Sequence, residues 1–255
     1  MTHEPSILKL PNGNYIAYHK FEGKKNKPFI VFLGGFMSDM NGTKALYLEE
    51  HCKNNDYGYL RFDYFGHGSS SGEFTEGTIG KFKDSAIEVI DQLTEGQLIL
   101  IGSSLGGWLM NLIAIERNHR VDGMIGIASA PDFTEELIYN KMSDAEKFIL
   151  ENEGVFYIDS EYGEKPYPIT LDLIEEGRNH LILKDNIPIF CPVWLIHGQK
   201  DNDVPSTLSL MLGKQLLSDN VKVELIEEGD HRMSSTAILL LICKMLDKMI
   251  IDLMR

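Results

Sequence analysis

Cysteine is scarce in this sequence of 255 residues, and its few cysteines form no motif. Cys52, Cys191 and Cys243 are scattered and odd in number, with no C-x-x-C pair among them. An odd number of scattered cysteines is not the pattern of a disulfide framework, and a zinc site needs clustered ligands, so neither is predicted. The three are expected to be small buried side chains in a reducing compartment.

Basic residues and long apolar runs are also scarce. Lysine and arginine total 24 against 38 aspartate and glutamate residues, for a formal net charge of −14. Such a surface repels phosphate backbones and anionic lipid headgroups, so nucleic acid is not expected as a partner. The longest apolar run near the C-terminus, "AILLLIC", falls far short of the ~20 residues that span a bilayer. The N-terminal "MTHEPSILKLPNG" has no basic region followed by an apolar core, so no signal peptide is predicted and a cytoplasmic location is expected.

Short apolar runs alternate along the chain with longer segments of helical period. The composition, 43% hydrophobic and 24% charged, suits one globular domain with one layered core. The alternation predicts an α/β fold, with a mostly parallel central sheet and helices on both of its faces. Near-continuous apolar runs are typical of strands buried on both sides. The strand candidates are "PFIVFL", "YGYLRFD", "QLILIG", "VDGMIGIAS", "CPVWLIHG" and "NVKVELIEEG".

The two ends of the chain carry signals of their own. Two apolar runs flank Asn12-Gly13, a strong signal for a two-residue turn, and predict an antiparallel N-terminal hairpin beside the parallel sheet. The last segment is predicted to be a helix whose apolar face packs on the sheet. The residues at helical spacing on that face are Ile238, Ile242, Met245, Met249, Ile250 and Leu253.

The alternation is interrupted over residues 132–186, which contain no clear strand but several amphipathic pieces. Long insertions in compact domains are usually functional, which favours a cap or lid over the active site, although a structural crossover layer also fits. We therefore divide one domain into a first core part (1–131), a cap insertion (132–186) and a second core part (187–255). The insertion is rich in apolar side chains, most of which are expected to hold the cap to the core, while the cap as a whole is predicted to roof an acyl pocket. These side chains are Phe133, Leu137, Ile138, Phe148, Ile149, Phe156, Tyr157 and Tyr167.

Two stretches match G-x-S-x-G, the turn that exposes a nucleophilic serine at the top of such a sheet. Ser104 lies in "QLILIGSSLGGWLM", between a buried strand and a helical pattern, with Gly102 and Gly106 on either side. Ser70 lies in "GHGSSSG", a long polar loop, and its helical pattern begins only near Thr78. The strained turn that exposes a nucleophile needs a buried strand before it and a helix directly after it, so Ser104 is the predicted nucleophile.

An acid and then a histidine should follow, each just beyond a later strand. "HGQKDNDVP" offers Asp201 and Asp203, and "EEGDHRM" offers His231. Asp203 precedes a predicted helix, where it would act as a cap, so Asp201 is preferred as the acid. His231 is the predicted base. His197 is expected to pack beneath the loop that carries Asp201 and Asp203, hereafter the acid loop.

The reaction also needs an oxyanion hole. One donor is the N–H of Leu105, which follows the serine, and the second comes from the loop "FLGGFMSDMNG". Phe36 is the first candidate in that loop and Met37 the next. The sequence lacks the third glycine of a dinucleotide fingerprint, the lysine of a P-loop and any histidine pair at metal-binding spacing. No cofactor, metal or obligate protein partner is predicted.

These motifs together resemble one family. The combination of "NGTKA", "GSSLGGWLM", "HGQKDNDVP" and "DHRM" is similar to the abhydrolase domain-containing protein ten family of α/β-hydrolases, which includes a mitochondrial palmitoyl-protein thioesterase and acyl-glucuronide esterase and bacterial relatives. The resemblance covers nearly the whole chain. It implies an α/β-hydrolase fold with a helical cap between the sixth and seventh strands, and a triad of Ser104, Asp201 and His231. This chain begins at the predicted fold, which favours a cytoplasmic bacterial relative.

The sequence therefore predicts a serine hydrolase that cleaves carboxylic esters or thioesters of acyl chains through an acyl-enzyme intermediate. Its partners would be small or acylated substrates. Two alternatives stay open, a serine peptidase on the same fold and a non-catalytic binding protein that has kept the fold. Turnover of a series of acyl esters separates all three.

Overall fold

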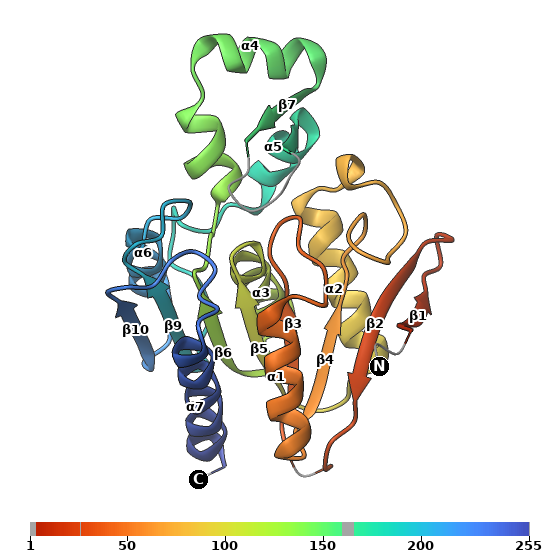
Figure 1. Ribbon diagram of the computed structural model, residues 1–255, viewed down its shortest axis with the longest axis vertical. Helices are drawn as coiled ribbons and strands as arrows, with labels where there is room; N and C mark the ends of the chain where they lie inside the picture. The colour runs from red at the N-terminus through yellow and green to blue at the C-terminus, as the bar shows by residue number, and fades with distance from the viewer. Residues whose placement is uncertain (1–3, 26, 160–165, 255) are drawn as a thin grey trace.

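An eight-stranded sheet forms the centre of the computed structural model, which describes residues 4–25, 27–159 and 166–254 (Figure 1). Its strands lie in the order β1-β2-β4-β3-β5-β6-β9-β10, parallel from β4 to β10 and antiparallel at β1 and β2. This confirms the predicted sheet. The strands are β1 (Ser6–Lys9), β2 (Tyr15–Phe21), β3 (Phe29–Leu33), β4 (Gly58–Phe62), β5 (Leu98–Ser103), β6 (Val121–Ile127), β9 (Val193–Gly198) and β10 (Val221–Ile226).

The middle strands are apolar because helices cover both of their faces. Every residue of β3, β4, β5 and β9 is buried. In Figure 1, α1 and α7 lie in front of the sheet and α2, α3 and α6 lie behind it, and two separate clusters of buried side chains fill these layers. The helices are α1 (Thr43–Asn54), η1 (Phe74–Glu76), α2 (Ile79–Leu93), α3 (Leu105–Glu116), α6 (Thr207–Gln215) and α7 (Thr236–Leu253). Within the described part of the chain, no helix is both long and apolar enough to cross a bilayer.

The N-terminal hairpin is present, but its turn is longer than the predicted two residues. β1 and β2 end their pairing at Lys9 and Tyr15. Between them the N–H of Leu10 donates to the Asn14 carbonyl at 2.8 Å, and the N–H of Gly13 donates to the Leu10 carbonyl at 3.1 Å. Gly13 has a φ of 88°, the conformation that glycine adopts after a type I turn in longer hairpin loops. The Asn-Gly pair therefore marks the turn correctly and its length incorrectly.

The segment 132–186, hereafter the cap segment, stands above the carboxyl ends of the parallel strands (Figure 1). Asp132 ties its two ends together, because its carboxylate accepts hydrogen bonds from the N–H groups of Ile182 and Leu183, at 2.9 Å for the shortest bond to each. The prediction that this segment contains no clear strand is wrong: β7 and β8 pair antiparallel as a small separate sheet. Its elements are η2 (Thr134–Ile138), η3 (Tyr139–Lys141), α4 (Asp144–Glu153), β7 (Val155–Ile158), β8 (Tyr167–Thr170), α5 (Leu171–Gly177) and η4 (Arg178–His180).

Candidate active site

Ser104 occupies a sharp turn between β5, which ends at Ser103, and α3, which begins at Leu105. Its φ of 54° and ψ of −116° are unfavourable for a residue with a side chain. Two hydrogen bonds fix this strained backbone: the N–H of Ser104 donates to the Ile127 carbonyl at 3.0 Å, and its carbonyl accepts from the N–H of Ala130 at 3.1 Å. The turn therefore has the strained geometry that the sequence predicts for the nucleophile.

The glycines around Ser104 are required by close backbone approach. A Cβ on Gly102 would overlap the carbonyl of Gly106, and a Cβ on Gly106 would overlap the carbonyl of Leu33. These contacts let the first turn of α3 press against the ends of β5 and β3. The unpaired N–H groups at the start of α3 therefore point toward the space beside Ser104.

Ser70, in the other G-x-S-x-G match, has a different environment. Its hydroxyl donates to the Asp63 carbonyl at 2.7 Å and accepts from the N–H of Ala17 at 2.9 Å. It ties β2 to the loop after β4, and both of its hydrogen bonds go to the backbone.

The structure brings Ser104, His231 and Asp201 together from three separate loops. His231 Nε2 lies 3.1 Å from Ser104 Oγ, and His231 Nδ1 donates to Asp201 Oδ2 at 2.7 Å. The loop after β9 and the loop after β10 are joined by backbone hydrogen bonds from Gln199 and Lys200, 2.8 and 2.9 Å long. These bonds hold the carboxylate and the imidazole at a fixed separation.

Asp201 is buried and surrounded by hydrogen-bond donors. Its Oδ1 accepts from the N–H groups of Asp203 at 3.0 Å and Val204 at 2.8 Å. Its Oδ2 accepts from His231 and also from His197 Nε2, at 3.1 Å. Burial alone raises the pKa of Asp201, but the hydrogen bonds from the two histidines and the charge of His231 outweigh it and hold the pKa below its usual range. The carboxylate is therefore ionised at neutral pH.

Asp203 does not have the role expected for it. α6 begins at Thr207, and Ser206 occupies the position before it, so Asp203 does not cap this helix. Its exposed side chain lies instead beside the triad, where ligand atoms of Asp203, Asp201 and His231 are all within 4.8 Å of one another. Such a cluster offers oxygen and nitrogen ligands to a cation, but two of the three groups already bond to each other through the His231 proton.

The loop after β3 lies directly against the serine. A Cβ on Gly35 would lie in van der Waals contact with the Ser104 Cβ, at 3.5 Å, so no side chain separates this backbone from the proposed nucleophile. Phe36 and Leu105 both line the cavity that contains Ser104. The loop is anchored by Asp63, which accepts from the N–H of Met40 at 2.6 Å.

Arg61 adds a second anchor, because its guanidinium donates to the Met40 carbonyl at 2.9 Å. Neither anchor is among the residues predicted from the sequence. Charged residues inside the apolar run "YGYLRFD" are nevertheless unusual enough to suggest buried partners.

Two cavities meet at Ser104 and His231. The smaller, of about 220 Å³, is mostly apolar and lies under the cap segment, between Phe133, Leu137 and Ile169. The larger, of about 670 Å³, has apolar as well as charged side chains in its wall and extends from Ser104 toward α1. Four of the eight apolar cap residues singled out from the sequence line the smaller cavity: Phe133, Leu137, Ile138 and Tyr167. Phe148, Ile149 and Tyr157 are instead exposed, so those three neither roof the cavity nor hold the cap to the core.

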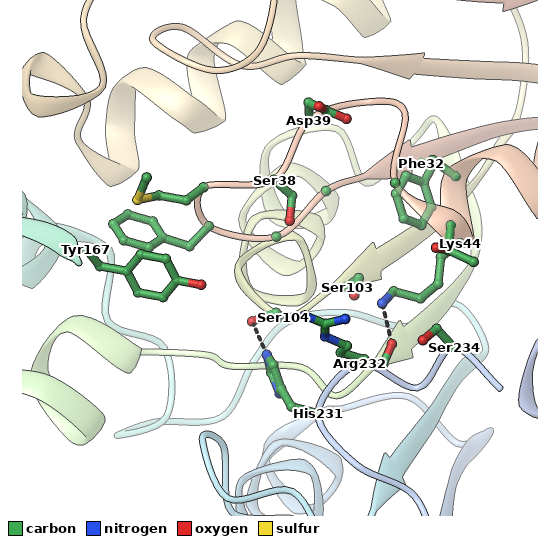
Figure 2. Close-up of a pocket in the computed structure, with 17 residues that line it drawn as sticks. Phe32, Ser38, Asp39, Lys44, Ser103, Ser104, Tyr167, His231, Arg232 and Ser234 are labelled. Atoms are coloured by element: carbon green, nitrogen blue, oxygen red, sulfur yellow. Dashed lines mark hydrogen bonds between the residues drawn. The ribbon is translucent and has the colours of Figure 1, made fainter. Parts of the chain in front are cut away.

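Two cations line the larger cavity. In Figure 2 the side chains of Lys44 and Arg232 point into the same space as Ser104 and His231. Lys44 Nζ donates to the Arg232 carbonyl at 2.5 Å. Desolvation lowers the pKa of Lys44 to about 8, with Asp230 opposing this change and Arg232 adding to it. Asp39 supplies an acidic group at the far edge of the cavity.

Known proteins share this fold over nearly the whole chain. The sequence profile of the alpha/beta hydrolase fold family matches residues 27–167. Human palmitoyl-protein thioesterase ABHD10, a mitochondrial protein, is 41% identical over 246 residues, which are 96% of this chain and 79% of the human protein. Mouse alpha/beta hydrolase domain-containing protein 10 superposes with a TM-score of 0.91 at 38% identity, covering 98% of this chain and 100% of the mouse chain. A crystal structure of a protein from Agrobacterium vitis S4 gives a TM-score of 0.92 at 35% identity, with 98% of each chain covered.

These similarities cover almost the whole chain. The sequence identities are well above those at which two proteins share only their fold. They confirm the resemblance stated from the sequence motifs. The relatives named ABHD10 are mitochondrial, so a cytoplasmic location for this chain stays a prediction. The chain belongs to the α/β-hydrolase family, in the group that contains ABHD10, and it is a hydrolase.

Proposed function

We propose that this chain hydrolyses esters or thioesters of acyl chains through an acyl-enzyme on Ser104. The observation that carries the proposal is the line of two hydrogen bonds from Ser104 through His231 to Asp201, 3.1 and 2.7 Å long. A serine hydroxyl is a poor nucleophile until an imidazole takes its proton, and a buried carboxylate holds that imidazole in the required tautomer. Relatives named palmitoyl-protein thioesterase support the class of substrate.

In the acylation step, Ser104 Oγ attacks the acyl carbonyl carbon while His231 Nε2 takes its proton. Asp201 stabilises the imidazolium that forms. The N–H groups of Phe36 and Leu105 bind the negative oxygen of the tetrahedral intermediate, a role supported by the close approach of Gly35 to Ser104 and by the start of α3. The intermediate then collapses, and His231 returns the proton to the departing alcohol or thiol.

In the deacylation step, a water molecule gives a proton to His231 Nε2 and attacks the acyl carbonyl. The second tetrahedral intermediate releases the carboxylic acid and restores Ser104. A thiolate leaves more readily than an alkoxide, so a thioester needs no group beyond those already named.

The two cavities assign the two halves of the substrate. The acyl chain fits the apolar cavity under the cap segment, where each buried methylene gains ~0.8 kcal/mol from leaving water. The leaving group then lies in the larger cavity, where Lys44 and Arg232 favour an alcohol or thiol that carries a negative charge.

Turnover of p-nitrophenyl esters and matched acyl thioesters tests the proposal. Both series should be hydrolysed, and one fluorophosphonate should attach to Ser104, as located by mass spectrometry. Ser104→Ala should lose on the order of 10⁴–10⁶ in kcat, because the triad acts as a unit. Ser70→Ala is the matched control and should keep its kcat.

An adduct on Ser70, or none, would refute the choice of nucleophile. Faster cleavage of p-nitroanilides than of esters would favour the peptidase alternative. Binding of acyl compounds without any turnover would favour the non-catalytic one.

A further inference from the structure

Asp201 bonds to a second histidine that the steps above do not use. His197, the penultimate residue of β9, is completely buried, and its Nε2 lies 3.1 Å from Asp201 Oδ2. The same nitrogen lies 2.9 Å from the Val204 carbonyl. Four N–H groups thus surround one carboxylate, two from the backbone at Oδ1 and two from imidazoles at Oδ2.

The partners of His197 determine where its protons lie. A carboxylate oxygen and a carbonyl oxygen only accept hydrogen bonds, so Nε2 carries a proton and donates to both Asp201 and Val204. The hydroxyl of Ser209, which is also completely buried, lies 2.7 Å from Nδ1 and donates to it. This bond from α6 fixes both the tautomer and the orientation of the ring.

The carboxylate of Asp201 needs such a donor because its end torsion is soft. Rotation about the Cβ–Cγ bond of aspartate has broad minima rather than sharp ones. The two oxygens of the planar carboxylate turn together about this bond, so the backbone N–H groups at Oδ1 limit the rotation and a rigid donor at Oδ2 limits it further. His231 is a poor choice for that task, since it must itself be held in line with Ser104.

We propose that His197 is a positioning residue, which fixes Asp201 Oδ2 in the orientation that aligns His231 with Ser104. The proposal rests on the proposed function of the triad. Its chain of contacts runs from Ser209 through His197 to Asp201, and it joins α6, β9 and the acid loop to the base. His197 lines neither cavity, so it acts on the triad through Asp201, and its other bond, to the Val204 carbonyl, reaches only the wall of the smaller cavity.

Two amides at position 197 test the proposal. In His197→Gln the amide N–H reaches the place of Nε2 and can still donate to Asp201. In His197→Asn the amide reaches only the place of Nδ1, so the bond to Asp201 is lost while a polar, uncharged side chain is kept. Each variant is compared with the wild type by kcat, KM, thermal midpoint and the low-field proton NMR signal of the hydrogen bond between His231 and Asp201. Loss of this signal in Asp201→Asn identifies it.

We expect His197→Asn to lose about 10- to 100-fold in kcat with KM little changed, because misplacing a catalytic group by an ångström has effects of this size. Its low-field signal should broaden or shift, and His197→Gln should recover most of the rate and the signal. Equal kcat and equal signals in the two variants would overturn the proposal, as would a loss confined to KM.

Two further measurements keep the test decisive. If His197→Asn does not fold, Ser209→Ala replaces it, and an unchanged kcat and signal in folded Ser209→Ala would also overturn the proposal. If the wild type hydrolyses none of the esters or thioesters, the proposed function fails, while the NMR comparison still reports whether His197 orders the bond between Asp201 and His231.

Discussion

Replacing Asp201 by asparagine should leave a folded protein that has lost almost all of its hydrolase activity. The backbone decides how the new amide sits. The N–H groups of Asp203 and Val204, 3.0 and 2.8 Å from Oδ1, need an acceptor, so the amide oxygen takes the Oδ1 position. The amide NH₂ then takes the Oδ2 position and faces two imidazole nitrogens that are both donors in the wild type.

The size of the loss follows from this reversal. To accept a hydrogen bond from the new NH₂ group, His231 must move its proton from Nδ1 to Nε2. Nε2 is the atom 3.1 Å from Ser104 Oγ, and once protonated it cannot take the proton of the serine. The wrong tautomer costs about 10⁴ in kcat in Ser-His-Asp enzymes, which corresponds to ~5.4 kcal/mol at 1.36 kcal/mol per tenfold change.

Asp203→Asn is the matched control, two residues away. Its side chain is exposed and does not cap α6, so stability should change by no more than about 0.5 kcal/mol. Its kcat with p-nitrophenyl octanoate should stay close to that of the wild type. Thermal midpoints for both variants show that the proteins being compared are folded.

The reasoning is refuted if Asp201→Asn keeps more than about a tenth of the wild-type kcat, since a single tautomer change would then be worth under 1.4 kcal/mol. It is also refuted if Asp203→Asn is the more damaging change. In that case Asp203, whose carboxylate lies close to both Asp201 and His231, would be the working acid.

Three other predictions concern the cavities and a buried histidine. The kcat/KM for acyl esters should rise up to ~fourfold per methylene from acetyl to octanoyl. Leu137→Trp should remove that gain without slowing the hydrolysis of acetyl esters. Equal kcat/KM for acetyl and octanoyl esters would exclude an apolar acyl cavity. Lys44→Met should lower kcat/KM more for thioesters of 3-mercaptopropionate than for thioesters of its uncharged amide. In the wild type, the preference for the charged thiol should weaken as the pH rises through about 8, because Lys44 loses its charge there. His67 is buried among aromatic rings, and desolvation lowers its pKa from 6.5 to about 4. Because the unfolded state binds the proton first as the pH falls, the free energy of unfolding should decrease by about 3 kcal/mol between pH 6.5 and pH 4. In urea titrations, the free energy of unfolding of His67→Phe should depend less on pH than that of the wild type, and identical pH dependence would contradict this.

The sheet could be predicted from the sequence because its central strands are buried on both faces. That burial demands runs such as "QLILIG", and neither loops nor surface helices produce them. The site around Ser104 could be predicted for a related reason. A strained turn tolerates few residues, and the overlaps at Gly102 and Gly106 leave only glycine. In both places local geometry restricts the choice of residue.

The errors lie where tertiary contacts, rather than local geometry, decide the structure. β7 and β8 are short, only partly buried and paired with each other alone, so they carry no apolar run long enough to stand out. The position of Asp203 just before an expected helix predicts a helix cap. The helix begins later than that spacing indicates, and the side chain faces the triad instead.

His197 shows how a buried strand can carry a polar signal in its sequence. It lies near the end of a strand buried on both faces, where an imidazole without partners would cost several kcal/mol. A strand-end histidine in a buried run must therefore find polar partners close by, and the acid loop that begins two residues later is the nearest source. The bond from His197 to Asp201, four residues later in "HGQKD", meets this need. The bond from His197 also explains why the Asp201 carboxylate can be buried and still ionised. The strand that carries the acid loop supplies the carboxylate with a second imidazole donor.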